Sequence, residues 1–144
     1  MTDHALLNRL ILLKVSPGEL LDRLSILKLK ESRVTDPAKL ENVRAELHIV
    51  KDAWEDSVYS IRVSAEILRL CRELDAANTT IWDCEDEIRQ PVGAVKVAAA
   101  ALSARAANNH RASLKRLINM ELDCTLMEEK SYDQGGRDGR DANE

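Results

Sequence analysis

One polar strip in the sequence combines the residue types that a ligand pocket needs. Asn78, Trp82, Glu85 and Arg89 are separated by four, three and four positions, and this spacing places them on one face of a helix. Asp86 lies along the edge of the same strip. The indole ring offers a stacking surface, while the amide, carboxylates and guanidinium offer hydrogen-bond donors and acceptors. Such a combination is typical of a helix face that lines a pocket.

A second polar strip follows closer to the end of the chain. Asn108, Arg111, Lys115 and Asn119 recur at intervals of three or four residues and therefore point the same way. If the two strips face each other, they enclose a polar cleft in which Arg111 and Lys115 can hold a phosphate or carboxylate. We therefore predict that a phosphorylated small molecule, either a nucleotide or a sugar phosphate, binds these residues: Asn78, Trp82, Glu85, Asp86, Arg89, Arg111, Lys115 and Asn119.

The same charged residues also fit a purely structural role. Residues 73–90 carry six acidic residues and one arginine, whereas residues 91–127 carry five basic residues and two acidic ones. An acidic helix that pairs with a basic helix would satisfy these charges within the protein. The alternative function is then a non-catalytic protein–protein interaction or accessory module, in which an apolar helix face meets a second copy or another protein.

A third interpretation is a metal-dependent nucleotide hydrolase. Asp83, Asp86 and Glu87 lie at i, i+3 and i+4, a spacing that can gather carboxylates around a metal ion. Glu19-x-x-Asp22 together with Asp83-x-x-Asp86 is similar to the paired acidic motifs of helical nucleotide pyrophosphatases. The sequence lacks the full E-E-x-x-E element upstream of an E-x-x-D, so we assign no metal site and leave the cofactor open.

Composition narrows the classes of partner. The chain has 144 residues and a net charge of −4, which argues against a nucleic-acid-binding protein that works by neutralising phosphates. Its three cysteines show no C-x-x-C spacing, so neither a zinc site nor a disulfide framework is indicated. The apolar run Leu10 to Leu13 is not expected to belong to a signal peptide, because it lacks a basic region before it and a small-residue cleavage site after it. No stretch approaches the roughly 20 apolar residues that span a membrane. We expect a cytoplasmic protein with no membrane or nucleic-acid partner.

The residues that position the two strips predict an all-α fold. Ser16 to Glu19 form a helix start with a serine cap and proline at the first helical position, and Asp36-Pro37 repeats this signal. Apolar residues then follow a 3-4 rhythm from Leu40 to Trp54 and again from Ile67 to Ile88. The two apolar seams are out of phase, which predicts a break between residues 55 and 64. Residues 5–15 are either a short helix or an extended arm.

The second half of the chain predicts further helices. Pro91-Val92-Gly93 ends the helix that carries the first strip. An alanine-rich helix is expected over residues 94–106, a turn at Asn108-Asn109, and a last helix over residues 110–129. The polar, glycine-containing segment 133–144 is expected to be a disordered tail. The predicted architecture is one helical domain over residues 1–132, an irregular bundle of four to five helices.

Five segments of the chain form an ordered set of motifs: Ser16 to Leu20 (SPGEL), Leu27 to Arg33, Lys39 to Val43, Asn78 to Arg89 (with WDxED) and Glu128 to Tyr132 (EEKSY). Together they resemble a small bacterial and phage helical domain family of unknown function. The resemblance covers about residues 15–132 and implies a helical domain and a candidate set of residues, but no activity. Proximity of members to glycosyltransferase-type proteins would favour a sugar or sugar-phosphate context. The chain departs from the family pattern between Arg89 and Asn108, which is alanine-rich, and at Asn109, where aspartate is expected.

Overall fold

The protein is an all-α bundle, as the sequence predicts. The computed structural model describes residues 9–126 of the chain, and these residues contain helices but no strand. The expected disordered tail, residues 133–144, and the EEKSY segment lie outside the described residues. The elements are α2 (Pro17–Arg33), α3 (Pro37–Asp56), the short 3-10 helix η1 (Ser60–Arg62), α4 (Ala65–Arg89) and α5 (Ala94–Glu121).

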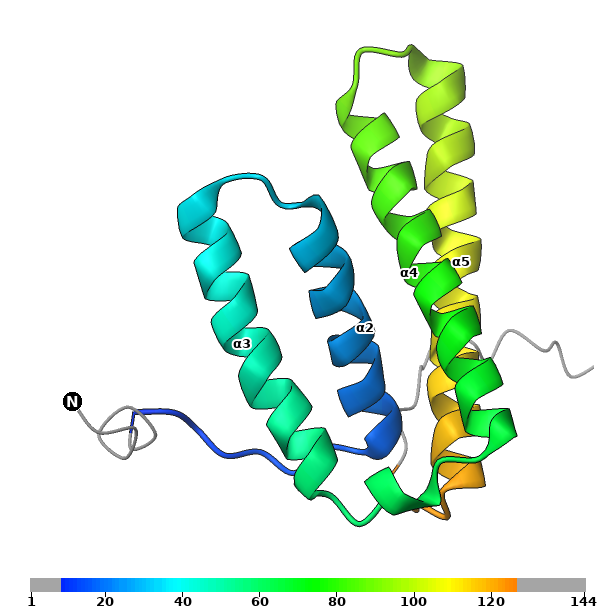
Figure 1. The fold of residues 1–144 in the computed structure, drawn as a ribbon. Helices are drawn as coiled ribbons and strands as arrows, with labels where there is room; N and C mark the ends of the chain where they lie inside the picture. Colours follow the sequence, from blue (N-terminus) through cyan, green and yellow to red (C-terminus); the bar gives the residue numbers. More distant parts are fainter. Residues whose placement is uncertain (1–8, 127–144) are drawn as a thin grey trace, which may run out of the picture.

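The helices form two antiparallel hairpins that lie side by side. Figure 1 shows α2 and α3 as the shorter hairpin and α4 and α5 as the longer one, whose far end extends beyond its neighbour. Helix α2 contacts α3, α4 and α5, whereas α3 contacts only α2 and η1 among the described elements. Helix α2 therefore joins the two hairpins, and any site shared by them must involve it.

Capping residues define where three of the helices begin. The side chain of Ser16 accepts a hydrogen bond from the backbone N–H of Glu19 at 3.2 Å, which places Pro17 at the first helical position. Asp36 caps α3 in the same way, with Lys39 N at 2.9 Å, and Ser64 caps α4. Proline fits the first turn because that position lacks an intrahelical acceptor for its missing N–H. The predicted starts at residues 16–19 and 36–37 are confirmed.

The main core lies between α2, the N-terminal half of α4 and the C-terminal end of α5. Its largest fully buried side chains are leucines and isoleucines, which suits a chain that contains no phenylalanine. A smaller cluster of Cys84, Ala100 and Ala104, with Ile88 packed against it, holds the far end of the α4–α5 hairpin together. The fully buried residues of the main core are Leu27, Ile67, Leu70, Leu74, Leu114 and Ile118.

Helix α5 corrects the expected division at Asn108-Asn109. The predicted turn is wrong, because a single helix runs from Ala94 to Glu121. Ala100, Ala104, Leu114 and Ile118 are buried, and residues 107 and 111 are half-buried between them, so the 3-4 rhythm continues without a break through the asparagines. Packing along this continuous stripe outweighs the low helix propensity of asparagine, which costs only a few tenths of a kcal/mol per residue. The helix also ends at Glu121 rather than at residue 129.

The other open points of the sequence are settled by the described residues. The predicted break between residues 55 and 64 is confirmed, because α3 ends at Asp56 and α4 begins at Ala65, with η1 between them. Of the segment 5–15, residues 9–15 are described and are not helical, so this part is an arm, while residues 5–8 lie outside the described residues. None of the described helices is both long enough and apolar enough to span a bilayer.

Candidate functional site

A cavity of about 260 Å³ lies between α2, α4 and α5, at the place where the two polar strips meet. Ile26 and Leu29 of α2 and Ile81 of α4 give it an apolar wall, and Trp82 and Arg111 add a ring and a cation. The structure brings six of the eight predicted site residues to this one cavity. They are Asn78, Trp82, Glu85, Asp86, Arg89 and Arg111.

A second cavity of about 390 Å³ adjoins the first and shares Ile26 and Arg111 with it. It lies over α2 between α3 and α5 and is lined mainly by charged side chains, Lys115 among them. Arg111 therefore stands where an apolar, ring-lined hollow meets a charged one. The charged residues around the second cavity are Glu19, Asp22, Arg23, Lys30, Glu46, Arg111 and Lys115.

A buried polar network lies beside Arg111 and contributes Asn78 to the first cavity and Asp22 to the second. Asp22 is buried, and its Oδ2 atom lies 3.9 Å from Nε of Arg111. Asn78 donates hydrogen bonds from Nδ2 to Asp22 Oδ1 and to Ser25 Oγ, each at 3.1 Å, and Ser25 in turn donates to Asp75 at 2.6 Å. Among residues 9–126 no buried side-chain nitrogen or oxygen lacks a hydrogen-bond partner. The network therefore satisfies its own buried members, and Arg111 lines both cavities next to it.

Lys115 and Asn119 connect α5 to the first turn of α2. Nζ of Lys115 lies 2.5 Å from Oε2 of Glu19, and the Lys115 side chain is largely buried. The backbone N–H of Gly18 donates to Oδ1 of Asn119 at 2.7 Å in a buried hydrogen bond. Asn119 does not line either cavity described above. These two predicted site residues therefore fasten two helices together, and only Lys115 also faces a cavity.

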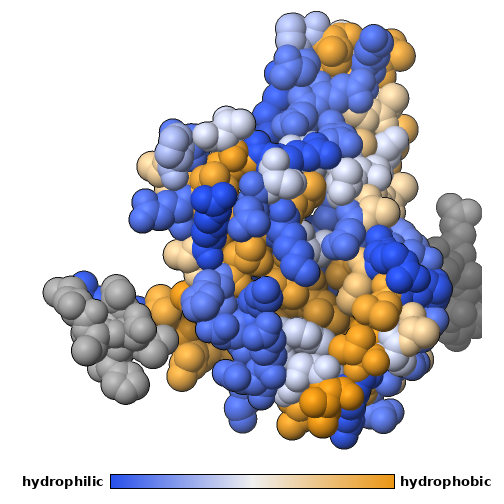
Figure 2. Space-filling model, viewed as in Figure 1, coloured by the Kyte–Doolittle hydropathy of each residue, from blue (hydrophilic) through white to orange (hydrophobic). Residues whose placement is uncertain are grey.

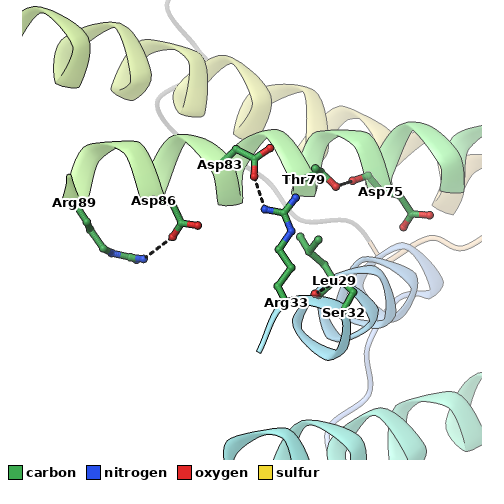
Figure 3. Close-up of polar contacts among 8 residues, drawn as sticks. All are labelled: Leu29, Ser32, Arg33, Asp75, Thr79, Asp83, Asp86 and Arg89. Atoms are coloured by element: carbon green, nitrogen blue, oxygen red, sulfur yellow. Dashed lines mark hydrogen bonds and ion pairs between the residues drawn. The ribbon is translucent and has the colours of Figure 1, made fainter. Parts of the chain in front are cut away.

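The charges of α4 pair with partners other than the basic residues expected from α5. Arg33, at the end of α2, reaches across to the carboxylate of Asp83, as Figure 3 shows. Asp86 and Arg89 lie within one turn of each other on α4, with Arg89 Nη1 3.5 Å from Asp86 Oδ1, and both side chains are largely exposed. The ion pairs of Arg111 and Lys115 also run to α2. Helix α2 thus provides the counter-charges for Arg111 and Lys115 of the second strip, whereas Asp86 and Arg89 of the first strip pair within α4.

The described residues give no support to the predicted carboxylate cluster. Across residues 9–126 no three His, Cys, Asp or Glu side chains are grouped so that they could hold a metal ion. Asp83 is engaged by Arg33, and Asp22 by Asn78 and Arg111. The other two carboxylates of the acidic motifs are also engaged, Glu19 by Lys115 and Asp86 by Arg89.

The sequence interpretation missed the residues of α2 that complete the site. Asp22 and Ser25 follow the buried leucines Leu21 and Leu24 by one position each, so they share the periodicity of the core face. Small polar residues in phase with a buried apolar stripe indicate a buried polar contact. That signal was available in the sequence, but the partner, Asn78, lies 56 residues from Asp22 and could not be identified without the fold.

The fold and the site define an all-α bundle in which one half-buried arginine, Arg111, lines two adjoining cavities. Comparison of the chain with protein-family models, with curated proteins and with solved structures found no match. A function must therefore be inferred from the cavities and from the side chains around them.

Proposed function

We propose that this protein binds a small phosphorylated molecule, a nucleotide or a sugar phosphate, in the cavity between α2, α4 and α5. The observation that carries the proposal is the position of Arg111, whose half-buried guanidinium lies 3.9 Å from the carboxylate of Asp22 and lines both cavities. A guanidinium that is oriented before the ligand arrives loses less side-chain freedom when it binds a phosphate in a two-point contact.

The other residues of the cavity suit the remaining parts of such a ligand. Trp82, with Ile26 and Leu29, offers a flat apolar surface for a base or sugar ring. Glu85 and Asp86 can accept hydrogen bonds from hydroxyl groups, and Arg89 can add a second cation at the rim. Asn78, Lys115 and Asn119 keep the helices in place, so the proposed contact set is narrower than the sequence predicts.

The cavity sizes set the size of the ligand. The first cavity, at about 260 Å³, lies just below the roughly 300–1,000 Å³ of ordinary ligand pockets. The second adds about 390 Å³ on the other side of Arg111. A ligand with one ring beside Trp82 and a phosphate at Arg111 fits this arrangement better than a long dinucleotide does.

Thermal unfolding in the presence of nucleotides and sugar phosphates, with and without Mg²⁺, tests the proposal. A ligand at about 100 times its Kd should add about 2.7 kcal/mol to the free energy of unfolding, a rise in Tm of roughly 8 °C. Arg111→Ala should abolish the shift, whereas Arg105→Ala, an exposed arginine of the same helix that lines neither cavity, should leave it unchanged. A panel without any shift would contradict the proposal.

The Tm of Arg111→Ala without ligand separates a binding residue from a structural one. The Nε atom of Arg111 is 3.9 Å from Asp22, a long contact, while Asp22 keeps its hydrogen bond from Asn78. The variant should therefore lose well below the 3–5 kcal/mol of a broken buried ion pair. A larger loss would assign Arg111 to the stability of the fold.

A second candidate function, a non-catalytic interaction or accessory module, is favoured by a different feature. The arm before α2 exposes a run of large apolar side chains, Leu10 to Leu13. Exposed apolar patches of this kind mark interaction surfaces on folded proteins. The two functions use different residues, so they are compatible in one molecule.

A further inference from the structure

The arm before α2 leaves consecutive apolar side chains in water. Ile11 is 95% exposed, Leu12 93% and Leu13 81%, and Leu10 and Val15 are also exposed. In Figure 1 this segment passes the C-terminal end of α3 before it enters α2. Burial of each such side chain is favourable, so this run of residues favours association.

Next to the arm lies an apolar groove that the arm lines without filling. Its volume is about 590 Å³, larger than either cavity of the candidate site. The start of α2 and the second half of α3 form its floor, with Leu20, Val50, Ala53 and Trp54 among the lining residues. Figure 2 shows apolar surface at the lower left of the molecule. The exposed apolar arm therefore lies directly beside an apolar groove of the same chain.

We infer that two copies of this protein associate by exchanging arms, so that residues 10–15 of each copy occupy the groove of the other. A two-fold symmetric contact uses the same surface on both subunits. In this dimer each arm would lie in the groove of the other copy, so both arms and both grooves would be covered. A different protein would cover both the arm and the groove only if it had its own apolar groove for the arm and its own apolar segment for the groove.

The size of the surface agrees with this assignment. The arm contributes six residues and the groove eleven more to each side. A standard protein interface uses about 20 to 30 residues a side, so the arm and groove alone approach its lower limit. The chain's own residues 133–144 are a poor alternative occupant, because apart from Ala142 they are polar, charged or glycine.

Sedimentation equilibrium over a range of protein concentrations tests the association. The wild-type chain of 16.1 kDa should approach twice that mass as concentration rises. Leu12→Asp should raise the dimer Kd by about 100- to 10,000-fold, because the symmetric contact loses two buried leucine side chains and each corresponds to about 10- to 100-fold. Val95→Asp, at an equally apolar and 85% exposed position on α5, is the matched control and should leave the Kd unchanged. Both side chains are exposed, so both variants should keep the wild-type helix content.

A groove variant distinguishes exchange from simple contact between two arms. Ala53→Asp places a charge in the groove but leaves the arm intact. In an exchanged dimer this charge faces the partner's arm, so Ala53→Asp should raise the dimer Kd as Leu12→Asp does. A dimer Kd that Ala53→Asp leaves unchanged would overturn the exchange. A wild-type chain that stays monomeric up to its solubility limit, even if its arm binds anionic lipid vesicles, would overturn the dimer.

Discussion

Replacing Gly18 with alanine tests how closely α2 and α5 approach each other. An added Cβ would lie 2.4 Å from the carbonyl oxygen of Lys115 and 2.8 Å from Oδ1 of Asn119. The Asn119 side chain can rotate away, but the carbonyl of Lys115 belongs to the backbone of α5. One helix must therefore move, and the buried hydrogen bond from Gly18 N to Asn119 is lost or stretched.

The expected sign of the change follows from competing magnitudes. Overpacking costs about 1–3 kcal/mol, and a buried polar group without its partner costs about another 1–3 kcal/mol. Against this, alanine in a helix is more favourable than glycine by about 0.5–1 kcal/mol. Gly18→Ala should therefore lower the free energy of unfolding by about 1–5 kcal/mol, a large part of the roughly 5–15 kcal/mol of a typical domain.

Urea unfolding followed by far-UV circular dichroism measures this change. Ala38 provides a matched control, because it follows Pro37 in α3 exactly as Gly18 follows Pro17 in α2, yet it is exposed. Ala38→Gly should lower stability by up to about 1 kcal/mol, the ordinary cost of glycine in a helix. A stabilising effect of Gly18→Ala would mean that the two helices do not approach as closely as described.

Further predictions concern the polar network, a cysteine and an exposed ion pair. Asn78→Ala should lower the free energy of unfolding by about 2–3 kcal/mol in the same urea assay, because Asp22 and Ser25 lose a buried donor; an unchanged midpoint would refute the network. Burial raises the pKa of the Cys71 thiol, so at neutral pH a thiol reagent should modify it more slowly in the folded protein than in urea, and equal rates would contradict this. Hydrogen bonds from Arg69 lower the pKa of Glu66, so its stabilising contribution is complete above the ordinary carboxyl pKa and is lost as the pH falls through the lowered value. Glu66→Gln should therefore flatten the acid side of a Tm-against-pH curve, and a curve identical to that of the wild type would count against the pair.

Local signals in the sequence predict most of the helix boundaries but not the long α5. Caps and prolines act within a few residues, so Ser16 and Asp36 reveal where their helices begin. The pair Asn108-Asn109 is a local turn signal that tertiary packing overrides, since the buried stripe from Ala100 to Ile118 continues through it. Whether the chain turns at Asn108-Asn109 or continues as one helix depends on the packing of α4 along the whole of α5. No local sequence pattern indicates that packing.

The candidate site was predictable to the extent that each strip lies on one helix. Periodicity places Trp82 and Arg89 on one face of α4, and the structure brings Arg111 to the same cavity. The contribution of α2 was not predictable in this way, because the partners of Asp22 and Glu19 lie far along the chain. The five-segment resemblance stays a prediction, and its first segment has a physical reason here in the close approach at Gly18.

Helix α3 packs against only one neighbouring helix, so it is held in the bundle less firmly than the other three helices. Val50 is the only residue of α3 that is buried, and the helix contacts only α2 and η1 among the described elements. Separating α3 from α2 would leave the contacts of α2 with α4 and α5 intact, including the bonds of Gly18 and Asp22. Proteins open in units whose free energies range from nearly zero to that of global unfolding, and α3 meets the conditions for a low-energy unit. Its amide hydrogens can therefore exchange with solvent through an opening that the other three helices do not share.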